Sequence, residues 1–452
     1  MQGPANEERN RQSPSWAVLA VMTLAIAVGF IDRQVINLLI QPIKHDFGLS
    51  DLEVSLLQGS AFIVAYLLAS PVFGVWADIS NRRNILLGCL VVWSGFTVLC
   101  GFATGFTSLF IARALVGMAE AGLTPSAFSI LSDSFDEKRL SRALSIYNIG
   151  PYVGSGMALL LGGAVLHEAE GWNLAAVPLL AGVRPWQMTM MVVGVVGLIC
   201  AIPLMAIREP VRRGVPKEEE EGGKRRIPVA EAIAIMRSRA RFYVGYFGGM
   251  ALSIIPLYAF PAWIPTLATR QYHVPLSQVG LHYGIVTIAA GTCGVLTGPW
   301  WVAILQRRLG VRDGNLRIGI FTNLAVLVTC VLLAYRPSYM ALLAIAGTAC
   351  FFYSMTAPLA ATSAQIVTPN RMRGLVTAIY LVIAGAMGLA LSPVLVAFLT
   401  DKVFRDEVRV GDSVALVCGV ATLGAAAMFA WCLRGYHGLL DKPITIEVKL
   451  PS

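Results

Sequence analysis

Four charged residues interrupt two long apolar stretches in the first half of the chain. Asp32 and Arg33 are neighbours in one stretch, and Arg113 and Glu120 are seven residues apart in another. A charge inside a bilayer costs several kcal/mol or more, so it persists only with a partner, an aqueous cavity or a task. Two carboxylates and two guanidiniums in apolar surroundings therefore predict a site that handles protons and a polar or charged solute.

Helix geometry predicts similar depths for these residues. At ~1.5 Å per residue, Asp32 lies ~12 Å and Arg113 ~9 Å below the same membrane face. Glu120 follows Arg113 by two turns on one helix face, which leaves Arg33 to face Glu120 or a bound solute. A carboxylate that alternates between an arginine neighbour and a dry site can carry a proton. Asp32 and Glu120 are therefore predicted to couple to protons, and Arg33 and Arg113 to bind the solute, unless all four form a static clamp between two helices.

The elements that position these residues are predicted to be membrane-spanning helices. The chain has 452 residues, 56% of them hydrophobic and 13% charged, with a mean hydropathy of +0.68, whereas soluble domains carry roughly 25% charged residues. Apolar stretches of about 20 residues, the length that crosses a bilayer, recur twelve times. They cover residues 15–40, 54–77, 84–104, 107–132, 141–166, 185–207, 242–268, 278–304, 317–335, 338–361, 374–400 and 413–434. No small-residue cleavage site follows the first stretch, which indicates a retained helix.

The distribution of basic residues predicts the orientation of the helices. Of the 35 Lys and Arg residues, 26 fall in connections on the side of the chain ends, 7 on the opposite side and 2 inside the stretches. By the positive-inside rule, both termini are expected in the cytoplasm, as in a multi-pass protein of the inner (cytoplasmic) membrane. The net charge of +9 then reflects membrane topology. Nucleic acid is not expected as a partner, because the basic residues are dispersed over separate loops.

Weak internal repeats divide the chain into two similar halves. A Leu-Ser pair precedes an even-numbered stretch at Leu49 and again 227 residues later, and the Arg-Arg pair at Arg82 recurs 225 residues later. Duplicated six-helix units place a substrate site between the halves near the midplane. The predicted fold class is therefore an all-α membrane protein with twelve transmembrane helices in two pseudo-symmetric six-helix bundles.

The predicted domains follow from these halves. They are a first bundle at 1–207, a cytoplasmic linker at 208–241, a second bundle at 242–436 and a cytoplasmic tail at 437–452. The linker is rich in charge, Gly and Pro, and it ends in a segment that fits an amphipathic helix on the membrane surface. A plain charged linker is the alternative.

The connection after the second stretch carries the most specific pattern. In GVWADISNRR, Gly74, Asp78, Arg82 and Arg83 form a G-x3-D-x3-R-R motif. Gly74 permits close helix approach, and Asp78 suits the positive N-terminus of a neighbouring helix. The arginines suit carbonyl ends or carboxylates. Together with Arg142, which is predicted on the same membrane side, these charged residues are expected to form a cytoplasmic gate.

This motif resembles the loop signature of the major facilitator superfamily of membrane transporters. The fourth stretch, LFIARALVGMAEAG, matches the L-x3-R-x3-G pattern of that family with Arg113 and Gly117. The fifth, IGPYVGSG, resembles its Gly-Pro-x-x-Gly segment with Gly150, Pro151 and Gly154. The resemblance implies the major facilitator fold, and it implies a gating role for these three residues of the fifth stretch.

Within the superfamily, FIDRQVINLLIQPIKHDFGLSDLE is similar to the spinster family of lipid transporters, as is Glu120 in its ARALVGMAEAG context. This resemblance implies transport of sphingolipid- or lysolipid-like amphiphiles. The short N-terminal tail and short loops are typical of a bacterial member. A similar Asp-Arg pair also occurs in organic anion:cation symporters, which keeps that second subfamily open.

Three polar residues of the first half are further candidates for the substrate site. Asn37 follows Arg33 by one turn, and Tyr147 and Asn148 follow the start of the fifth stretch. Each can form a hydrogen bond to a head group or join two helices.

The second half offers aromatic residues rather than charges. The resemblance places the seventh and tenth stretches at the central cavity, which makes Tyr258, Trp263 and residues 351–353 cavity candidates. Of these, Tyr258, Trp263 and Phe352 are predicted as substrate-binding residues. A charged half that faces an apolar half suits an amphiphile, with its head group at Arg33 or Arg113 and its tail on the second half.

These observations predict a secondary active transporter and no enzyme, cofactor or metal site. The chain contains no HExxH, GxSxG or nucleotide-binding loop, and its eight cysteines lie within or at the ends of apolar stretches, as expected for packing residues. The preferred function is proton-coupled transport of an amphiphilic lipid by alternating access, and the alternative is symport of small organic anions such as sugar acids. The expected partners are membrane lipids, the amphiphilic substrate and protons, and the chain is expected to act as a monomer.

Overall fold

The computed structural model describes residues 15–169, 182–212, 229–369 and 372–440, and every regular element in these ranges is a helix. Within them, 12 helical segments are long and apolar enough to cross a membrane. The expectation of an all-helical protein with twelve membrane-spanning helices is therefore confirmed.

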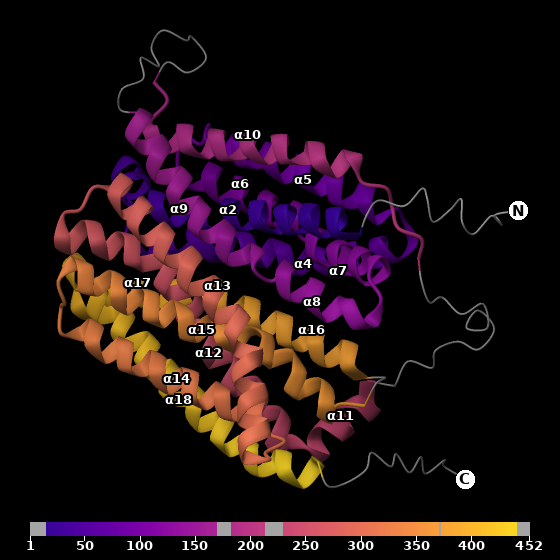
Figure 1. The fold of residues 1–452 in the computed structure, drawn as a ribbon. Helices are drawn as coiled ribbons and strands as arrows, with labels where there is room; N and C mark the ends of the chain where they lie inside the picture. The colour runs from indigo at the N-terminus through magenta and orange to yellow at the C-terminus, as the bar shows by residue number, and fades with distance from the viewer. Residues whose placement is uncertain (1–14, 170–181, 213–228, 370–371, 441–452) are drawn as a thin grey trace, which may run out of the picture.

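The first six spans form one bundle, drawn from indigo to magenta in Figure 1. Its unbroken spans are α2 (Ser15–Phe47), α5 (Arg82–Cys100) and α10 (Pro185–Ala206). The second span comprises α3 (Asp51–Ser55), η1 (Leu56–Ser60) and α4 (Ala61–Ile79). The fourth comprises α6 (Phe106–Glu120) and α7 (Leu123–Ser134), and the fifth comprises α8 (Glu137–Tyr147) and α9 (Gly150–Ala169).

The last six spans form the second bundle, which runs to orange and yellow in Figure 1. Its spans are α12 (Ala240–Tyr272), α13 (Leu276–Leu309), α14 (Gly314–Ala334) and α15 (Tyr339–Val367). The eleventh combines α16 (Arg373–Ala384), η6 (Gly385–Leu391), α17 (Ser392–Phe398) and η7 (Leu399–Phe404), and the twelfth combines η8 (Glu407–Arg409) and α18 (Val410–Leu440). A separate helix, α11 (Val229–Ser238), precedes this bundle where the amphipathic helix is predicted.

The described part of the chain begins and ends on the same side of the two bundles. We call this end, at the right of Figure 1, the terminal side, and the opposite end the distal side. Because α2 starts on the terminal side, the chain reaches the distal side between α2 and α3. The other pairs of helix ends on the distal side are those of α5 and α6, α9 and α10, α12 and α13, α14 and α15, and η7 and η8.

Glycines allow α9 and α13 to pack backbone to backbone across the junction of the bundles. A Cβ added to Gly280 would lie 2.4 Å from the carbonyl oxygen of Leu159, and one added to Gly156 would lie 2.5 Å from that of Gly284. Small residues let membrane helices approach this closely, because no side chain separates the backbones. The fifth and eighth spans therefore form one of the seams between the bundles.

The second and eleventh spans form another seam, where two π-helical segments meet. A Cβ added to Gly59 in η1 would lie 1.7 Å from the carbonyl oxygen of Leu389 in η6. The hydroxyl of Ser60 donates to the carbonyl of Ala390 at 3.3 Å, and the Gln58 amide donates to that of Ala262 at 2.9 Å. Single π-helical turns within α-helices are frequent at functional sites.

The hydrogen bonds and ion pairs that join the two bundles cluster in the distal half of the described structure. They involve residues 41–60 of the first bundle and residues 262–407 of the second. The protein is therefore held closed on its distal side.

Candidate functional site

The four charged residues of the first bundle meet between α2 and α6. Arg33 Nη2 lies 2.5 Å from Glu120 Oε1, and both side chains are nearly inaccessible, at 12% and 0% exposed. Arg113 Nη1 donates to the backbone carbonyl of Asp32 at 3.0 Å. The residues that the spacing places at a common depth are thus in contact in the structure, and Arg33 faces Glu120.

The cluster is balanced in charge but incomplete in its hydrogen bonds. Among the described residues, neither carboxylate oxygen of Asp32 accepts a hydrogen bond of ordinary geometry, although the side chains of Thr97 and Trp93 lie close to this carboxylate. Glu120 Oε2 and Arg113 Nη2 have no hydrogen-bond partner there either. Buried polar groups are normally satisfied, and the exceptions concentrate where a protein does chemistry or binds a ligand. These open positions leave the cluster able to accept a proton or a polar ligand group.

Aromatic rings surround the Arg33 guanidinium. Its central carbon lies 4.9 Å from the ring centre of Phe30, 4.7 Å from that of Phe62 and 5.3 Å from that of Tyr66. Phe62 also lies 5.8 Å from the Arg113 guanidinium. Ring faces attract cations, and they do so more strongly away from water. None of these rings is predicted from the sequence as part of the site, although Phe30 precedes Arg33 by three residues and lies on the same helix face.

Gly29 is the position that lets Glu120 reach α2. A Cβ added there would lie 2.6 Å from Glu120 Oε1 and 3.1 Å from the Leu123 side chain. Because Arg33 is one turn farther along α2, the missing side chain at Gly29 opens the space in which the carboxylate meets the guanidinium.

A cavity of ≈ 220 Å³ lies between the bundles beside this cluster. Phe30 and Gln34, which flank Arg33 on α2, form part of its wall, and Gln34 accepts a hydrogen bond of 2.5 Å from Asn37. The second bundle contributes mainly apolar and aromatic surface to the wall. The complete lining is Phe30, Gln34, Asn148, Pro151, Tyr152, Ser155, Leu257, Tyr258, Pro261, Thr287, Val295 and Tyr353.

Three predicted residues line this cavity, namely Asn148, Pro151 and Tyr258. Asn37 contacts it through Gln34. Tyr147 does not line it: its ring is buried against Phe128, with ring centres 5.4 Å apart.

Two predicted aromatic residues of the second bundle lie elsewhere, although the seventh and tenth spans do line the cavity. Trp263 is fully buried and donates from Nε1 to the carbonyl of Pro393 at 3.2 Å, so it joins α12 to α17. Phe352 packs on Phe321 of α14, with ring centres 5.7 Å apart. Successive residues of a helix point in directions about 100° apart. Tyr353, which follows Phe352, therefore faces the cavity while Phe352 does not.

The predicted gate is not assembled in this structure. Arg82 is buried and pairs with Asp133 and with Glu209, the latter at 2.6 Å, so it binds together the terminal ends of the first bundle. Arg83 donates to the carbonyls of Leu204 and Met205 at the end of α10. The arginines thus bind carboxylates and carbonyl ends as expected, but within one bundle.

The other members of the motif are free of the expected contacts. Asp78 is exposed, and its side chain makes no hydrogen bond or ion pair within the described residues; only its backbone carbonyl accepts a bond, from Arg212. Arg142 is exposed as well. A Cβ on Gly74 would meet nothing within 4 Å, so the expected close helix approach there is wrong for this state.

The glycines of the fifth span pack α9 against α2. A Cβ on Gly154 would lie 2.2 Å from the carbonyl oxygen of Ala27, and one on Gly150 would lie 2.4 Å from the Ile26 side chain. Their immediate effect is to hold α9, and with it the wall residue Pro151, against the helix that carries Arg33. No group of three or more His, Cys, Asp or Glu side chains that could hold a metal is found in the part of the chain that the structure describes.

Comparisons with known proteins agree with this architecture. Residues 22–393 match the family model described as Major Facilitator Superfamily. The chain is 27% identical over 402 residues to an MFS-type efflux pump of Mycolicibacterium smegmatis, a match that covers 88% of this chain and 87% of that protein. It is 24% identical over 409 residues to the sphingosine-1-phosphate transporter SPNS2 of Xenopus tropicalis, which covers 88% of this chain and 76% of that protein.

A solved structure shares the fold. It is a bacterial homolog of the human lysosomal transporter spinster in an inward-facing and unoccupied conformation. The two structures superpose with a TM-score of 0.73 over 94% of this chain and 98% of that chain, at 23% sequence identity.

Proposed function

The chain belongs to the major facilitator superfamily, and from this premise we propose that it moves an anionic amphiphile across a membrane together with a proton. It is a transporter related to the spinster and sphingosine-1-phosphate transporters. The proposal that an anionic amphiphile and a proton move together rests on the buried Arg33–Glu120 pair, 2.5 Å apart, beside a cavity between the bundles.

Coupling between substrate and proton follows because Glu120 and the anionic head group compete for the guanidinium of Arg33. Arg33 can bind the carboxylate of Glu120 or an anionic head group, and a phosphate or carboxylate suits its two parallel N–H donors. When the head group takes Arg33, Glu120 is left in an apolar site without a cation, and a carboxylate in that position binds a proton. Substrate and proton then enter the cluster together and leave its net charge unchanged.

The nearby Asp32 supplies a second place for the proton. Its carboxylate is fully buried and accepts no hydrogen bond of ordinary geometry among the described residues, while Arg113 donates to its backbone carbonyl. Arg113 therefore fixes α2 relative to α6 and lends positive charge to the site. We propose that Asp32 and Glu120 share the proton during the transport cycle.

The apolar wall of the cavity is proposed to take the tail of the amphiphile. Leu257, Tyr258 and Pro261 of α12 and Tyr353 of α15 present this wall opposite the charged cluster. Contact with it contributes about 0.8 kcal/mol per buried methylene until the wall is covered. Sphingosine-1-phosphate, the substrate for which one relative is named, combines such a tail with an anionic head group.

One observation favours a second candidate, a symporter of small organic anions such as sugar acids. The cavity of ≈ 220 Å³ is smaller than the ~300–1,000 Å³ of ordinary small-molecule pockets, and Gln34, Asn148 and Thr287 add polar groups to its wall. In the state closed on the distal side, a long tail has to extend beyond the cavity. A small anion fits inside it.

Competition between lipids of graded chain length separates the two candidates. The purified protein in liposomes takes up a labelled lysolipid phosphate, and unlabelled competitors differ only in tail length. Inhibition that strengthens with each added methylene supports the amphiphile. Equal inhibition by short polar anions and by long-chain lipids would replace it with the small-anion symporter.

The membrane placement is proposed from charge. Among the described residues, most Lys and Arg side chains lie on the terminal side. We therefore propose that this side faces the cytoplasm of a bacterial cell and that the protein lies in the inner membrane. The distal side, which is closed, then faces outward.

A further inference from the structure

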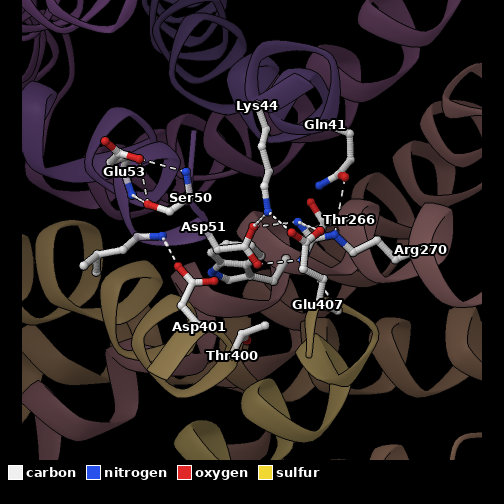
Figure 2. A network of polar contacts seen from close by, with 12 residues as sticks. Gln41, Lys44, Ser50, Asp51, Glu53, Thr266, Arg270, Thr400, Asp401 and Glu407 are labelled. Carbon is white, nitrogen blue, oxygen red and sulfur yellow. Dashed lines mark hydrogen bonds and ion pairs between the residues drawn. The ribbon is translucent and has the colours of Figure 1, made fainter. Parts of the chain in front are cut away.

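Four charged side chains join the two bundles at the distal side, where no site is predicted from the sequence. Figure 2 shows Lys44 and Asp51 from the first bundle beside Arg270 and Glu407 from the second. Asp51 is 0% exposed and Arg270 7%, so the centre of the group is buried although it lies at the end of the helices. We refer to these four residues as the distal quartet.

Two side-chain ion pairs of the distal quartet cross between the bundles, and one of them is bidentate. Arg270 donates from Nη1 and Nη2 to the two carboxylate oxygens of Asp51, each at 2.6 Å. Lys44 Nζ lies 2.7 Å from Glu407 Oε1. Two parallel bonds between a guanidinium and a carboxylate are among the strongest polar contacts in proteins, so these contacts favour closure of the distal side.

Each bundle also contributes one cation and one anion that can pair with each other. Within the first bundle, Lys44 Nζ lies 2.6 Å from Asp51 Oδ1, and within the second, Arg270 Nη2 lies 3.5 Å from Glu407 Oε2. If the bundles separate, the contacts that cross the junction are lost while these two pairs remain. No side chain of the distal quartet is then left as an unpaired charge, which is the situation that makes breaking a buried ion pair so unfavourable.

Neighbouring groups fix the geometry of the distal quartet. A capping box at the start of α3 holds Asp51 at the first turn of its span. In it, Ser50 Oγ accepts from the Glu53 N–H at 3.2 Å, and Glu53 Oε2 accepts from the Ser50 N–H at 2.8 Å. Asp401 of the second bundle accepts a bond of 2.8 Å from the N–H of Leu52 in that same turn, which has no partner within the helix. The start of the second span is thus held from both bundles (Figure 2).

We infer that the distal quartet is a reversible lock of the distal side, which opens by exchanging its cross-bundle ion pairs for ion pairs within each bundle. Closure is favoured by the bidentate Arg270–Asp51 contact. Opening remains energetically accessible because each charge keeps a partner within its own bundle and becomes exposed to water when the bundles separate. The inference rests on the alternating access proposed above, and it is independent of which substrate is carried.

Distances between spin labels on the two bundles test the lock directly. Nitroxide labels at Thr107 and Tyr335 report on the distal ends of the first and second bundle, where both residues are exposed. Cys200 and Cys293, the two cysteines that are not buried, are first replaced by serine. In detergent or liposomes, Arg270→Gln is expected to raise the population with the longer distance by about tenfold or more, because it removes one partner of a buried pair.

Two further variants test whether the change in distance arises from the distal quartet. Lys44→Gln leaves the bidentate contact in place and is expected to shift the population less than Arg270→Gln. Arg409→Gln removes an ion pair with Asp412 on the same side, 2.7 Å long but contained within the second bundle, and is expected to leave the distances unchanged. Wild-type distances in Arg270→Gln, or an equal shift in Arg409→Gln, would overturn the inference.

A conservative variant covers the case in which Arg270→Gln does not fold. Arg270→Lys retains the charge and loses the two parallel bonds, so an intermediate population of the longer distance is expected, and an unchanged population would count against the lock. The readout needs no transported substrate. Failure of every lipid or sugar acid in the uptake assay would therefore contradict the proposed function without affecting this result.

Discussion

Arg33 is the residue on which substrate and proton meet in the proposed cycle. Its guanidinium is enclosed by three aromatic rings and bonded to one carboxylate, with little exposure to solvent. In such surroundings a change of partner matters more than it would in water, because a charge left without a partner is not stabilised by solvent. The chemistry of the site is therefore decided by which anion Arg33 holds.

Neutralising either acid is expected to uncouple transport from protons. Glu120→Gln and Asp32→Asn keep the shape of the side chain but cannot take up a proton, so uptake driven by a pH gradient should be lost while the proteins remain folded. Uptake into liposomes with and without the gradient, beside thermal unfolding, measures both properties. Full pH-driven uptake in both variants would contradict the coupling proposal.

Replacing Arg33 by lysine is expected to weaken transport although the positive charge is retained. Lysine cannot form two parallel bonds to a phosphate or carboxylate and stacks less well on Phe30 and Phe62. We expect a loss of about 1–2 kcal/mol in apparent affinity, roughly tenfold. Titration of uptake against substrate concentration checks this. An unchanged half-saturation concentration would show that the substrate does not use the two parallel N–H donors of Arg33.

At the scale of helices, the loop motif after the second span acts within the first bundle in this structure. Arg82 joins the start of α5 to α7 and to the segment after α10, so its loss affects how these ends are held together. Arg142 on α8 is exposed and makes no such contact among the described residues. The same motif therefore contains a structural clamp and residues that are free to act in another state.

Arg82→Gln is expected to destabilise the fold by roughly 1–3 kcal/mol, because it leaves polar partners without their donor. The matched variant Arg142→Gln should change stability by less than about 0.5 kcal/mol, as is usual at exposed positions. Thermal unfolding in detergent compares the two. Equal melting temperatures for Arg82→Gln and the wild-type protein would show that the buried ion pairs contribute nothing.

The seam between the second and eleventh spans depends on the absence of a side chain at Gly59. Gly59→Ala places a methyl group 1.7 Å from the Leu389 carbonyl oxygen, which forces η1 and η6 apart and is expected to disfavour distal closure by about 1–3 kcal/mol. The distal label distance should lengthen in a larger fraction of molecules. Gly74→Ala lies in the same span against open space and should leave the distances unchanged; if both variants behave alike, the seam is not the cause.

For the whole molecule, the bonds between the bundles cluster on the distal side, whereas Asp78 and Arg142 are exposed on the terminal side. This asymmetry is what alternating access requires of one of its two end states. We propose that Asp78 and Arg142 make their gating contacts in the opposite state, in which the terminal side is closed.

Labelling from the two sides of the membrane tests the proposed orientation. In the background without Cys200 and Cys293, Arg142→Cys should react with an impermeant maleimide only in inverted vesicles, and Thr107→Cys only in intact cells. The positive-inside rule provides the reason, since most of the basic residues lie on the side of Arg142. Labelling of Arg142→Cys in intact cells would reverse the orientation.

The sequence alone determined the class of this protein and the depth of its ionic cluster. Apolar stretches of membrane length can fold only as helices that satisfy their own backbone, so their number predicts twelve spans, and the linear rise of a helix sets how deep Asp32 and Arg113 lie. The buried charges were conspicuous for the same reason, because a charge in such a stretch needs an explanation. Motifs such as Gly150-Pro151-x-x-Gly154 added the family.

The tertiary structure alone decided which side chains face the cavity and how the bundles meet. Whether Phe352 or Tyr353 lines the cavity depends on a rotation of about 100° between successive residues of a helix, and no apolar pattern resolves it when both faces are apolar. The distal quartet combines residues more than 350 positions apart, such as Lys44 and Glu407, each of which looks like an ordinary loop charge by itself. The quartet can be recognised only in the tertiary structure, because the packing of one bundle on the other brings these charges together.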